Sequence, residues 1–287
     1  MKYAFIENHR PLFRVEKMCR ILGASKSGYY AWRGWKKTRR QEENEMILDK
    51  IKEAYKKSHG IYGSPRITTE LHEKGIPCSE KRIARLMRVN NIMAKTKRRF
   101  KATTSSRHTL PVAPNLVQKD FGVQGAYKVW VSDITYIWTD EGWLYLAIIM
   151  DLFTRGIVGW AMSERITAEM VIKAFQQAIT RCNPPEGLIF HSDRGSQYAS
   201  YAFRSVLKCY GCIQSMSDKG DCYDNAVAES FFHTLKTEHV YFERYKTREE
   251  ARRSIFEYIE VFYNRVRRHS TLGNRSPYEF ERMANVA

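Results

Sequence analysis

One stretch decides the fold of the C-terminal half of this 287-residue chain: Trp130-Val-Ser-Asp-Ile-Thr-Tyr-Ile137. Its β-branched and aromatic residues predict a strand, and the same composition extends back to Tyr127. Asp133 lies in the middle of this strand. A carboxylate among strand-forming residues is costly to bury unless it meets a cation. The stretch therefore predicts both a strand and an acidic functional position.

The segments that follow predict a mixed sheet. Apolar runs at 143–151 and 157–162 predict two more strands, joined as antiparallel hairpins by glycine turns. A helix at 168–179, a short strand at 188–191, a helix near 201–210 and a strand around Ile213 come next. This order is that of a ribonuclease-H-like α/β fold, a mixed five-stranded sheet flanked by helices. In such a sheet the first and fourth strands are neighbours.

Two further acids fall at positions that this sheet would use. Asp193 follows the fourth predicted strand in His191-Ser-Asp-Arg-Gly-Ser-Gln-Tyr198. Because the first and fourth strands are neighbours, we expect Asp193 to lie beside Asp133. Glu229 lies on a predicted helix over 226–236, on the side opposite the aromatic residues and together with Lys236.

Three carboxylates of this kind predict a catalytic metal site. Two hard divalent ions about 4 Å apart can activate an attacking oxygen and stabilise the leaving oxygen in phosphoryl transfer. Mg²⁺ prefers carboxylate oxygens, and Mn²⁺ accepts the same ligands. We therefore expect Asp133, Asp193 and Glu229 to be both the catalytic residues and the ligands of two Mg²⁺ (or Mn²⁺) ions. We expect the nearby Asp151, Asp221 and Asp224 to serve turns and helix caps instead.

The net charge of +17 is concentrated in the N-terminal part. Lys and Arg outnumber Asp and Glu by 28 to 11 over residues 1–125, whereas the counts are 20 and 20 from residue 126 onward. Such segregation favours a polyanionic partner, and we expect this part to supply salt-sensitive affinity for DNA. The sequence contains no run of about 18 apolar residues and no signal peptide, which predicts no membrane partner and a cytoplasmic location.

Short helices are predicted throughout this basic part. A helix over Val15–Leu22, a stop at Gly23 and a second helix capped by Ser25 form a helix-turn-helix pattern. Further helices at 46–55, from residue 64 and from residue 79 predict a second module. We expect its last helix and the basic run after it to contact DNA, a solvated basic face being the alternative. The candidate residues are Arg82, Arg85, Arg88, Lys97, Arg98 and Arg99.

These patterns divide the chain into four segments. They are a helix-turn-helix-like segment at 1–42, a second basic helical module at 43–95, a basic linker at 96–122 and the catalytic core with C-terminal helices at 123–287. Within the last segment a long helix is predicted over 249–263. Arg267, Arg268 and His269 follow it, and we expect them to contact phosphate, an ordinary surface run being the alternative.

Several sequence motifs resemble those of a known family. Asp193 and Glu229 are separated by 35 residues, and Lys236 follows seven residues later. This pattern resembles the catalytic core shared by retroviral integrases and many bacterial transposases. The surrounding motifs are most similar to those of the insertion-sequence-three family of transposases, in the protein encoded by the second reading frame. They are the two stretches quoted above, Ser215-Met-Ser-Asp-Lys-Gly-Asp-Cys-Tyr-Asp-Asn-Ala226, Tyr263-Asn-Arg265 and His269, with further similarity around Gly23 and from Tyr62 to Leu86.

The resemblance implies cleavage at the ends of a mobile element and joining of those ends to target DNA. The implied partners are the terminal inverted repeats, the target DNA and further copies of the chain on DNA. The product of an upstream reading frame is a further implied partner, because family members are often made as frameshift fusions. Lys236, Gln197 and Tyr198 are implied to contact DNA near the cleaved phosphate, and a bacterial, nucleoid-associated location follows.

Two other interpretations remain open from the sequence. A ribonuclease-H-like nuclease that cuts without joining would explain the acids but not the basic N-terminal modules. An inactive, DNA-binding remnant of an element would explain the modules, although all three acids and Lys236 are present. For the C-x-x-C of Cys209 and Cys212 we favour reduced thiols over a zinc site, because no second ligand pair accompanies it.

Overall fold

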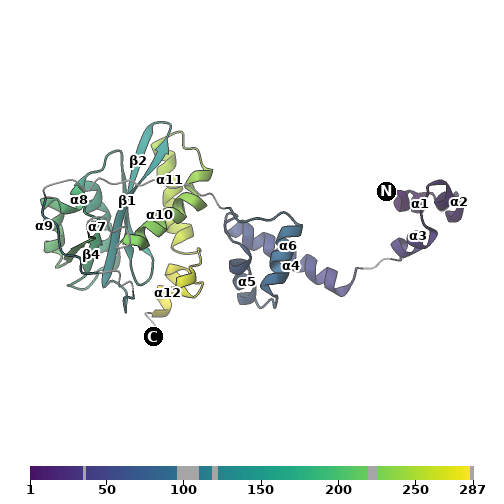
Figure 1. The fold of residues 1–287 in the computed structure, drawn as a ribbon, viewed down its shortest axis with the longest axis horizontal. Helices are drawn as coiled ribbons and strands as arrows, with labels where there is room; N and C mark the ends of the chain where they lie inside the picture. Colours follow the sequence, from purple (N-terminus) through teal and green to yellow (C-terminus); the bar gives the residue numbers. More distant parts are fainter. Residues whose placement is uncertain (35–36, 96–109, 118–121, 219–224, 285–287) are drawn as a thin grey trace. The chain divides into compact units, whose positions relative to one another are not determined.

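The computed structural model describes residues 1–34, 37–95, 110–117, 122–218 and 225–284. These residues form two compact units, Met1–Lys52 and Glu53–Ala287. Figure 1 shows their helices and strands in sequence colours. Within the described residues, no helix has the length and apolar character needed to span a bilayer.

The first unit contains three short helices, α1 (Lys2–His9), α2 (Val15–Ile21) and α3 (Lys26–Arg33). The prediction of Ser25 as a helix cap is confirmed, since its Oγ accepts the N–H of Gly28 at 3.1 Å. A small apolar core joins the three helices and consists of Ile6, Met18, Cys19 and Tyr29.

The next helix, α4 (Arg39–Lys57), begins seven residues before the predicted start at Met46. Its N-terminus has a capping box at Thr38 and Gln41. The N–H of Thr38 donates to Oε1 of Gln41 at 2.7 Å, and the N–H of Gln41 donates to Oγ1 of Thr38 at 3.3 Å. These two bonds satisfy orphan amides and extend the helix beyond the stretch that its apolar spacing predicts.

Two helices in the second unit lie where helices were predicted from residues 64 and 79. They are α5 (Ser64–Glu73), with a proline in its first turn, and α6 (Glu80–Val89), capped by the side chain of Ser79. Both bury one apolar face, which consists of Ile67, Leu71, Ile83, Leu86 and Met87.

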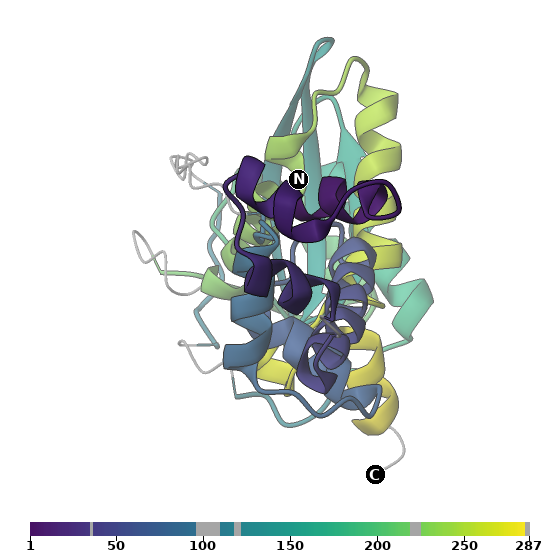
Figure 2. The same cartoon turned by 90° about the vertical axis from the view of Figure 1, so that its right-hand side faces the viewer.

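The prediction of a mixed five-stranded sheet is confirmed. Its strands are β1 (Val129–Thr139), β2 (Gly142–Asp151), β3 (Ile157–Ser163), β4 (Ile189–Ser192) and β5 (Ile213–Met216), in the order β3-β2-β1-β4-β5. The first three strands are antiparallel, whereas β4 runs parallel to both β1 and β5. The predicted neighbours β1 and β4 pair only over Val129–Ser132, so β1 continues beyond the end of β4. Figure 2 shows the β1–β2 hairpin extending past the shorter strands.

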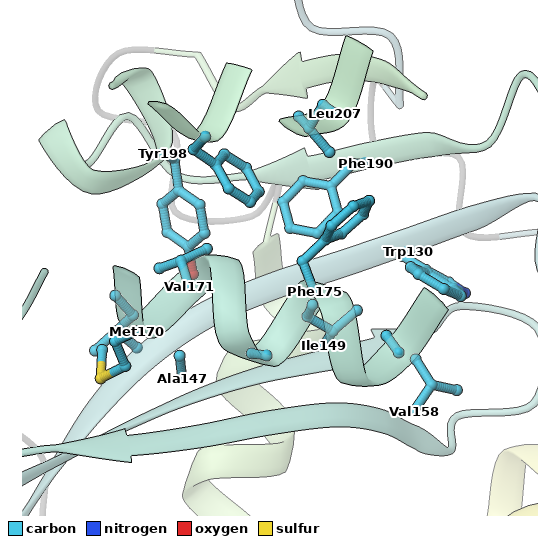
Figure 3. Packing of buried hydrophobic residues seen from close by; sticks show 14 of the residues in the cluster. Trp130, Ala147, Ile149, Val158, Met170, Val171, Phe175, Phe190, Tyr198 and Leu207 are labelled. Atoms are coloured by element: carbon cyan, nitrogen blue, oxygen red, sulfur yellow. The ribbon is translucent and has the colours of Figure 1, made fainter. Parts of the chain in front are cut away.

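Helices cover both faces of this sheet (Figure 1). On one side lie α7 (Ala168–Cys182), α8 (Ser196–Ala199) and α9 (Tyr201–Cys209). Figure 3 shows their side of the core, where Phe175 packs against Phe190 and Trp130. On the other side lie α10 (Ala226–Glu238) and α11 (Arg248–Phe256).

The C-terminal segment differs in one respect from the predicted single helix at 249–263. After α11 the chain continues as a π-helix, η3 (Glu257–Tyr263), which is wider than an α-helix. Its buried side carries Tyr258, Ile259, Phe262 and Tyr263. The remaining elements are two 3₁₀ turns, η2 (Val240–Phe242) and η4 (Ser270–Leu272), and the last helix, α12 (Pro277–Ala284).

Candidate active site

Asp133 is the first residue of β1 beyond its pairing with β4. Its side chain is partly exposed, and Oδ1 accepts the N–H of Ile134 at 2.7 Å. Burial and the charge of Asp193 raise the pKa of Asp133 well above its usual range, and the charge of Glu229 adds to this. The bond from Ile134 and the charge of Lys236 act in the opposite direction. Asp133 is therefore the centre of a group of interacting charges.

Asp193 comes directly after β4. Asp133 likewise comes directly after Ser132, the last residue of β1 that pairs with β4. Ser132 and Ser192 are register partners in the parallel ladder, so the two aspartates leave neighbouring strands at the same level. Oδ1 of Asp193 accepts the N–H of Gly195 at 3.0 Å, which holds the carboxylate at the turn before α8. The structure thus brings together the two acids that the sheet order predicted to be neighbours.

Glu229 lies in the first turn of α10, where a negative charge is favoured by the helix dipole. The helix is anchored by buried apolar residues, namely Ala228, Phe231, Phe232 and Leu235. Glu229 is exposed on another side, as its helical spacing predicted. Burial raises the pKa of Glu229, even though part of the carboxyl is open to solvent.

Lys236 lies two turns after Glu229 on the same helix. Its Nζ lies over the ring of Tyr136 on β1, 4.6 Å from the ring centroid. Burial lowers the pKa of Lys236, while the charge of Asp133 acts to raise it. A cation therefore lies within electrostatic reach of Asp133, between α10 and β1.

The three acids belong to three separate elements and interact through their charges, but they do not form a closed ligand set. Among the residues that the structure describes, no three Asp, Glu, His or Cys side chains converge closely enough to hold a metal ion. The donor chemistry of Asp133, Asp193 and Glu229 nevertheless fits a hard divalent cation. All three present carboxylate oxygens, and a cation between them would relieve the repulsion that raises the pKa of Asp133.

Gln197 and Tyr198, which were expected to contact DNA near the acids, differ in their exposure to solvent. Gln197 is partly exposed, and it remains a candidate. The expectation for Tyr198 is corrected, because its side chain is 0% exposed and lies in the core cluster of Figure 3. Its hydroxyl is 2.8 Å from Oγ of Ser132. Tyr198 therefore has no surface to offer to DNA.

The expected phosphate contacts after the long helix are also corrected. Arg267 and Arg268 are only 5% and 6% exposed. Arg267 donates twice to Glu238, at 2.7 Å in each case, whereas Arg268 binds acids of α5. Burial and the neighbouring arginine charges lower the pKa of His269 to about 3, so this imidazole is neutral at physiological pH. The cluster consists of structural ion pairs instead of free phosphate ligands.

The candidates on α6 keep the predicted orientation. Arg85 and Arg88 are exposed and Arg82 is partly exposed, on the side away from the buried residues of the helix. The remaining candidates Lys97, Arg98 and Arg99 lie outside the described residues. Asp151 has the turn role that the sequence predicted, because it accepts the N–H groups of Tyr127 and Thr154.

The sheet order and the matching family models define the class of protein. Models of the integrase core domain match residues 124–222 and 229–284, and a model of a helix-turn-helix-like domain matches residues 41–100. The chain therefore contains an integrase core, the fold of a class of polynucleotidyl transferases. It is also similar to a chain of the simian T-cell lymphotropic virus intasome, with a TM-score of 0.47 and 13% identity over 80% of this chain and 74% of that one.

Curated relatives define the family within this class. The chain is 44% identical to transposase InsF of insertion sequence IS3A from Escherichia coli (strain K12), over 98% of both chains. It is 49% identical to an uncharacterized 31 kDa protein of insertion element IS600 from Shigella sonnei, over 92% of this chain and 97% of that protein. The chain belongs to the IS3 family of transposases, which confirms the resemblance noted in the sequence. Its function is DNA transposition, and DNA is its substrate.

Proposed function

We propose that Asp133, Asp193 and Glu229 are the catalytic carboxylates of this transposase and the ligands of two Mg²⁺ or Mn²⁺ ions. One observation carries the proposal: Asp133 and Asp193 leave neighbouring strands at the same level, and the charges of Asp193 and of Glu229 on α10 both raise the pKa of Asp133. Repulsion of this kind costs stability, and it is retained where a site is built to receive cations.

When bound, the ions would activate the attacking hydroxyl and stabilise the leaving oxygen of the DNA phosphate. The residues of the chain would position the reaction. Asp133 projects from the rigid strand β1, Asp193 from the turn after β4, and Glu229 from the side of α10 opposite its buried residues. Lys236 would bind a phosphate of the DNA end. Its ammonium group lies over the ring of Tyr136, within electrostatic reach of Asp133.

We further propose that most of the affinity for DNA comes from residues outside the candidate active site. The residues from 126 onward carry equal numbers of basic and acidic side chains, whereas residues 1–125 carry the whole positive excess. The outer face of α6, with Arg82, Arg85 and Arg88, would bind the phosphates of the terminal inverted repeats and of target DNA. Joining two element ends requires at least two sites, so we propose that the chain acts as a multimer on DNA, with the product of the upstream frame as a further partner.

The triad is tested with three isosteric variants, Asp133→Asn, Asp193→Asn and Glu229→Gln. The substrates are labelled duplexes that carry an element end, either intact or already cut at the 3′ strand. With Mg²⁺ or Mn²⁺, each variant should lose both cleavage and strand transfer while retaining its affinity for the duplex. Asp140→Asn, which removes an exposed acid at the β1–β2 turn, serves as the matched control and should remain active. Normal activity in any one of the three variants would overturn the assignment.

A further inference from the structure

Ser132, the residue before Asp133, is fully buried and makes two side-chain hydrogen bonds. Its Oγ donates to the carbonyl oxygen of Ile148 on β2 at 2.8 Å and lies 2.8 Å from the hydroxyl oxygen of Tyr198. A serine hydroxyl has one hydrogen, which the Ile148 carbonyl takes. The hydroxyl of Tyr198 is therefore the donor in the second bond.

The backbone of Ser132 makes a third connection. Its carbonyl oxygen accepts a hydrogen bond from Nδ2 of Asn225 at 3.2 Å. Asn225 is 5% exposed and immediately precedes α10. The amide thus ties the start of the catalytic helix to the first strand at the residue next to Asp133.

These bonds join the three elements that carry the acids. Tyr198 follows Asp193 by five residues, and its own carbonyl is held at 2.8 Å by Nε2 of Gln214 on β5. Asn225 precedes Glu229 by four residues, about one helical turn. A single residue adjacent to Asp133 is therefore bonded to the segment after Asp193 and to the segment before Glu229.

We propose that Tyr198 and Asn225, joined through Ser132, are positioning residues that set the spacing of the three carboxylates. The inference rests on the proposed role of the triad. Like charges move apart unless other bonds hold them, so the acids cannot set their own spacing. Buried hydrogen bonds behind a metal site orient its ligands, and losing one typically lowers metal affinity or activity 10- to 100-fold.

The hydroxyl of Tyr198 can be separated from the packing of its ring. The ring packs near those of Phe190 and Phe203, with centroids 6.3 and 5.9 Å away, in an apolar cluster that also contains Phe175 (Figure 3). Tyr198→Phe therefore keeps the packing and removes only the bond to Ser132. Asn225→Asp likewise keeps the shape of the side chain and replaces the donor that faces the Ser132 carbonyl with an acceptor.

The test measures the binding of metal alone to the full chain, without DNA. A cation that binds the folded state raises the melting temperature as its concentration rises. Tyr198→Phe and Asn225→Asp should each need about ten times more Mg²⁺ or Mn²⁺ than wild type for the same rise. Tyr263→Phe is the matched control, because Tyr263 is 1% exposed and its hydroxyl donates to the carbonyl of Arg155. It should respond to metal as wild type does.

A double-mutant cycle sharpens the result. If the Tyr198 hydroxyl acts through Ser132, then Ser132→Ala combined with Tyr198→Phe should shift metal binding no further than either change alone. In strand transfer, excess Mg²⁺ should restore much of the activity of Tyr198→Phe but none of that of Asp133→Asn.

The outcomes separate this inference from the triad assignment. A wild-type metal response in both Tyr198→Phe and Asn225→Asp, with Asp133→Asn unresponsive to metal, would refute the positioning role and leave the triad standing. An unchanged metal response in Asp133→Asn would refute both. Should Tyr198→Phe fail to fold, Asn225→Asp decides the question alone, since it tests the connection through α10.

Discussion

Arg268 and Glu70 form a buried ion pair across 198 positions of sequence, with Nη2 of the arginine 2.9 Å from Oε2 of the glutamate. Arg268 also donates to Glu73 on the same helix and to the carbonyl of Asn274. The hydroxyl of Tyr62 accepts the N–H of Arg268 at 2.9 Å. These bonds fix α5 of the helix-turn-helix-like module to the C-terminal segment of the integrase core.

Arg268→Ala should destabilise the second unit strongly. The substitution leaves the Glu70 carboxylate buried without its main cation, and breaking a buried pair in this way costs about 3 to 5 kcal/mol. Urea unfolding of the full chain measures the loss. Arg253→Ala is the control, because its pair with Glu249 is exposed and worth about 0.5 kcal/mol or less. Equal losses in the two variants would contradict the structural role of Arg268.

The stability of this region should depend on pH through His269. Burial and the charges of Arg267 and Arg66 lower its pKa from 6.5 to about 3 in the folded chain. Below pH 6.5 the unfolded chain therefore binds a proton that the folded chain does not. The free energy of unfolding should then fall with decreasing pH, by up to about 1.4 kcal/mol per pH unit, and this contribution should vanish above pH 6.5.

Urea unfolding measured between about pH 5 and 7 checks this dependence. His269→Gln should flatten the profile over that range. His233→Gln, which changes an exposed histidine of α10, should leave the slope as it is in wild type. A profile that is unchanged by His269→Gln would show that the imidazole is not the group responsible.

Removal of the basic face of α6 should weaken DNA binding without regard to sequence. Each phosphate contact contributes a slope of about −0.9 to the logarithm of affinity against the logarithm of salt concentration. The triple variant Arg82→Ala, Arg85→Ala, Arg88→Ala should therefore reduce the magnitude of this slope by about 2 to 3. Fluorescence anisotropy with labelled duplexes at several salt concentrations measures it.

A second triple variant controls for net charge. Lys173, Arg204 and Lys208 are exposed on α7 and α9, so replacing them with alanine removes the same charge from the integrase core. This variant should leave the salt slope nearly unchanged. If the two triple variants changed the salt slope equally, α6 would contribute no more to DNA binding than another basic surface of the chain.

Gly159→Ala should destabilise the sheet. Gly159 lies on β3 against α7, and an added Cβ would overlap the carbonyl oxygen of Ala174 and lie 2.8 Å from Cβ of Ala178. The first of these is a backbone atom, so the backbone of α7 or β3 must shift to make room. Overpacking of this kind typically costs about 1 to 3 kcal/mol. A melting temperature equal to that of wild type would contradict the close approach of α7.

The order of elements and the face of α10 could be predicted from the sequence because both depend on local patterns. Alternation and apolar runs mark each strand, and the succession of three hairpin strands, a helix and a strand-helix-strand unit is that of a ribonuclease-H-like sheet. In a ribonuclease-H-like sheet the first and fourth strands are neighbours, so this order predicted that Asp133 and Asp193 lie close together, and β1 does pair with β4. The spacing of Phe231, Phe232 and Leu235 likewise oriented Glu229.

Burial of polar side chains could not be predicted in the same way. Arg267 and Arg268 occur in a basic run, and a run of this kind indicates charge but not exposure. Their partners are Glu238 and Glu70, which lie 29 and 198 positions away. Tyr198 presents the same difficulty, because the hydroxyl of Ser132 that it binds is 66 positions earlier.

The sequence by itself thus predicted the class of fold and the family, and it singled out the three acids that we propose to be catalytic. The tertiary structure decided that Arg267 and Arg268 are buried in ion pairs and which hydrogen bonds lie behind the acids. The physical reason is that a charged or hydroxyl-bearing side chain can be buried only where a partner meets it, and such a partner comes from any part of the chain. Apolar periodicity acts within one element, whereas hydrogen bonds and ion pairs depend on how elements pack.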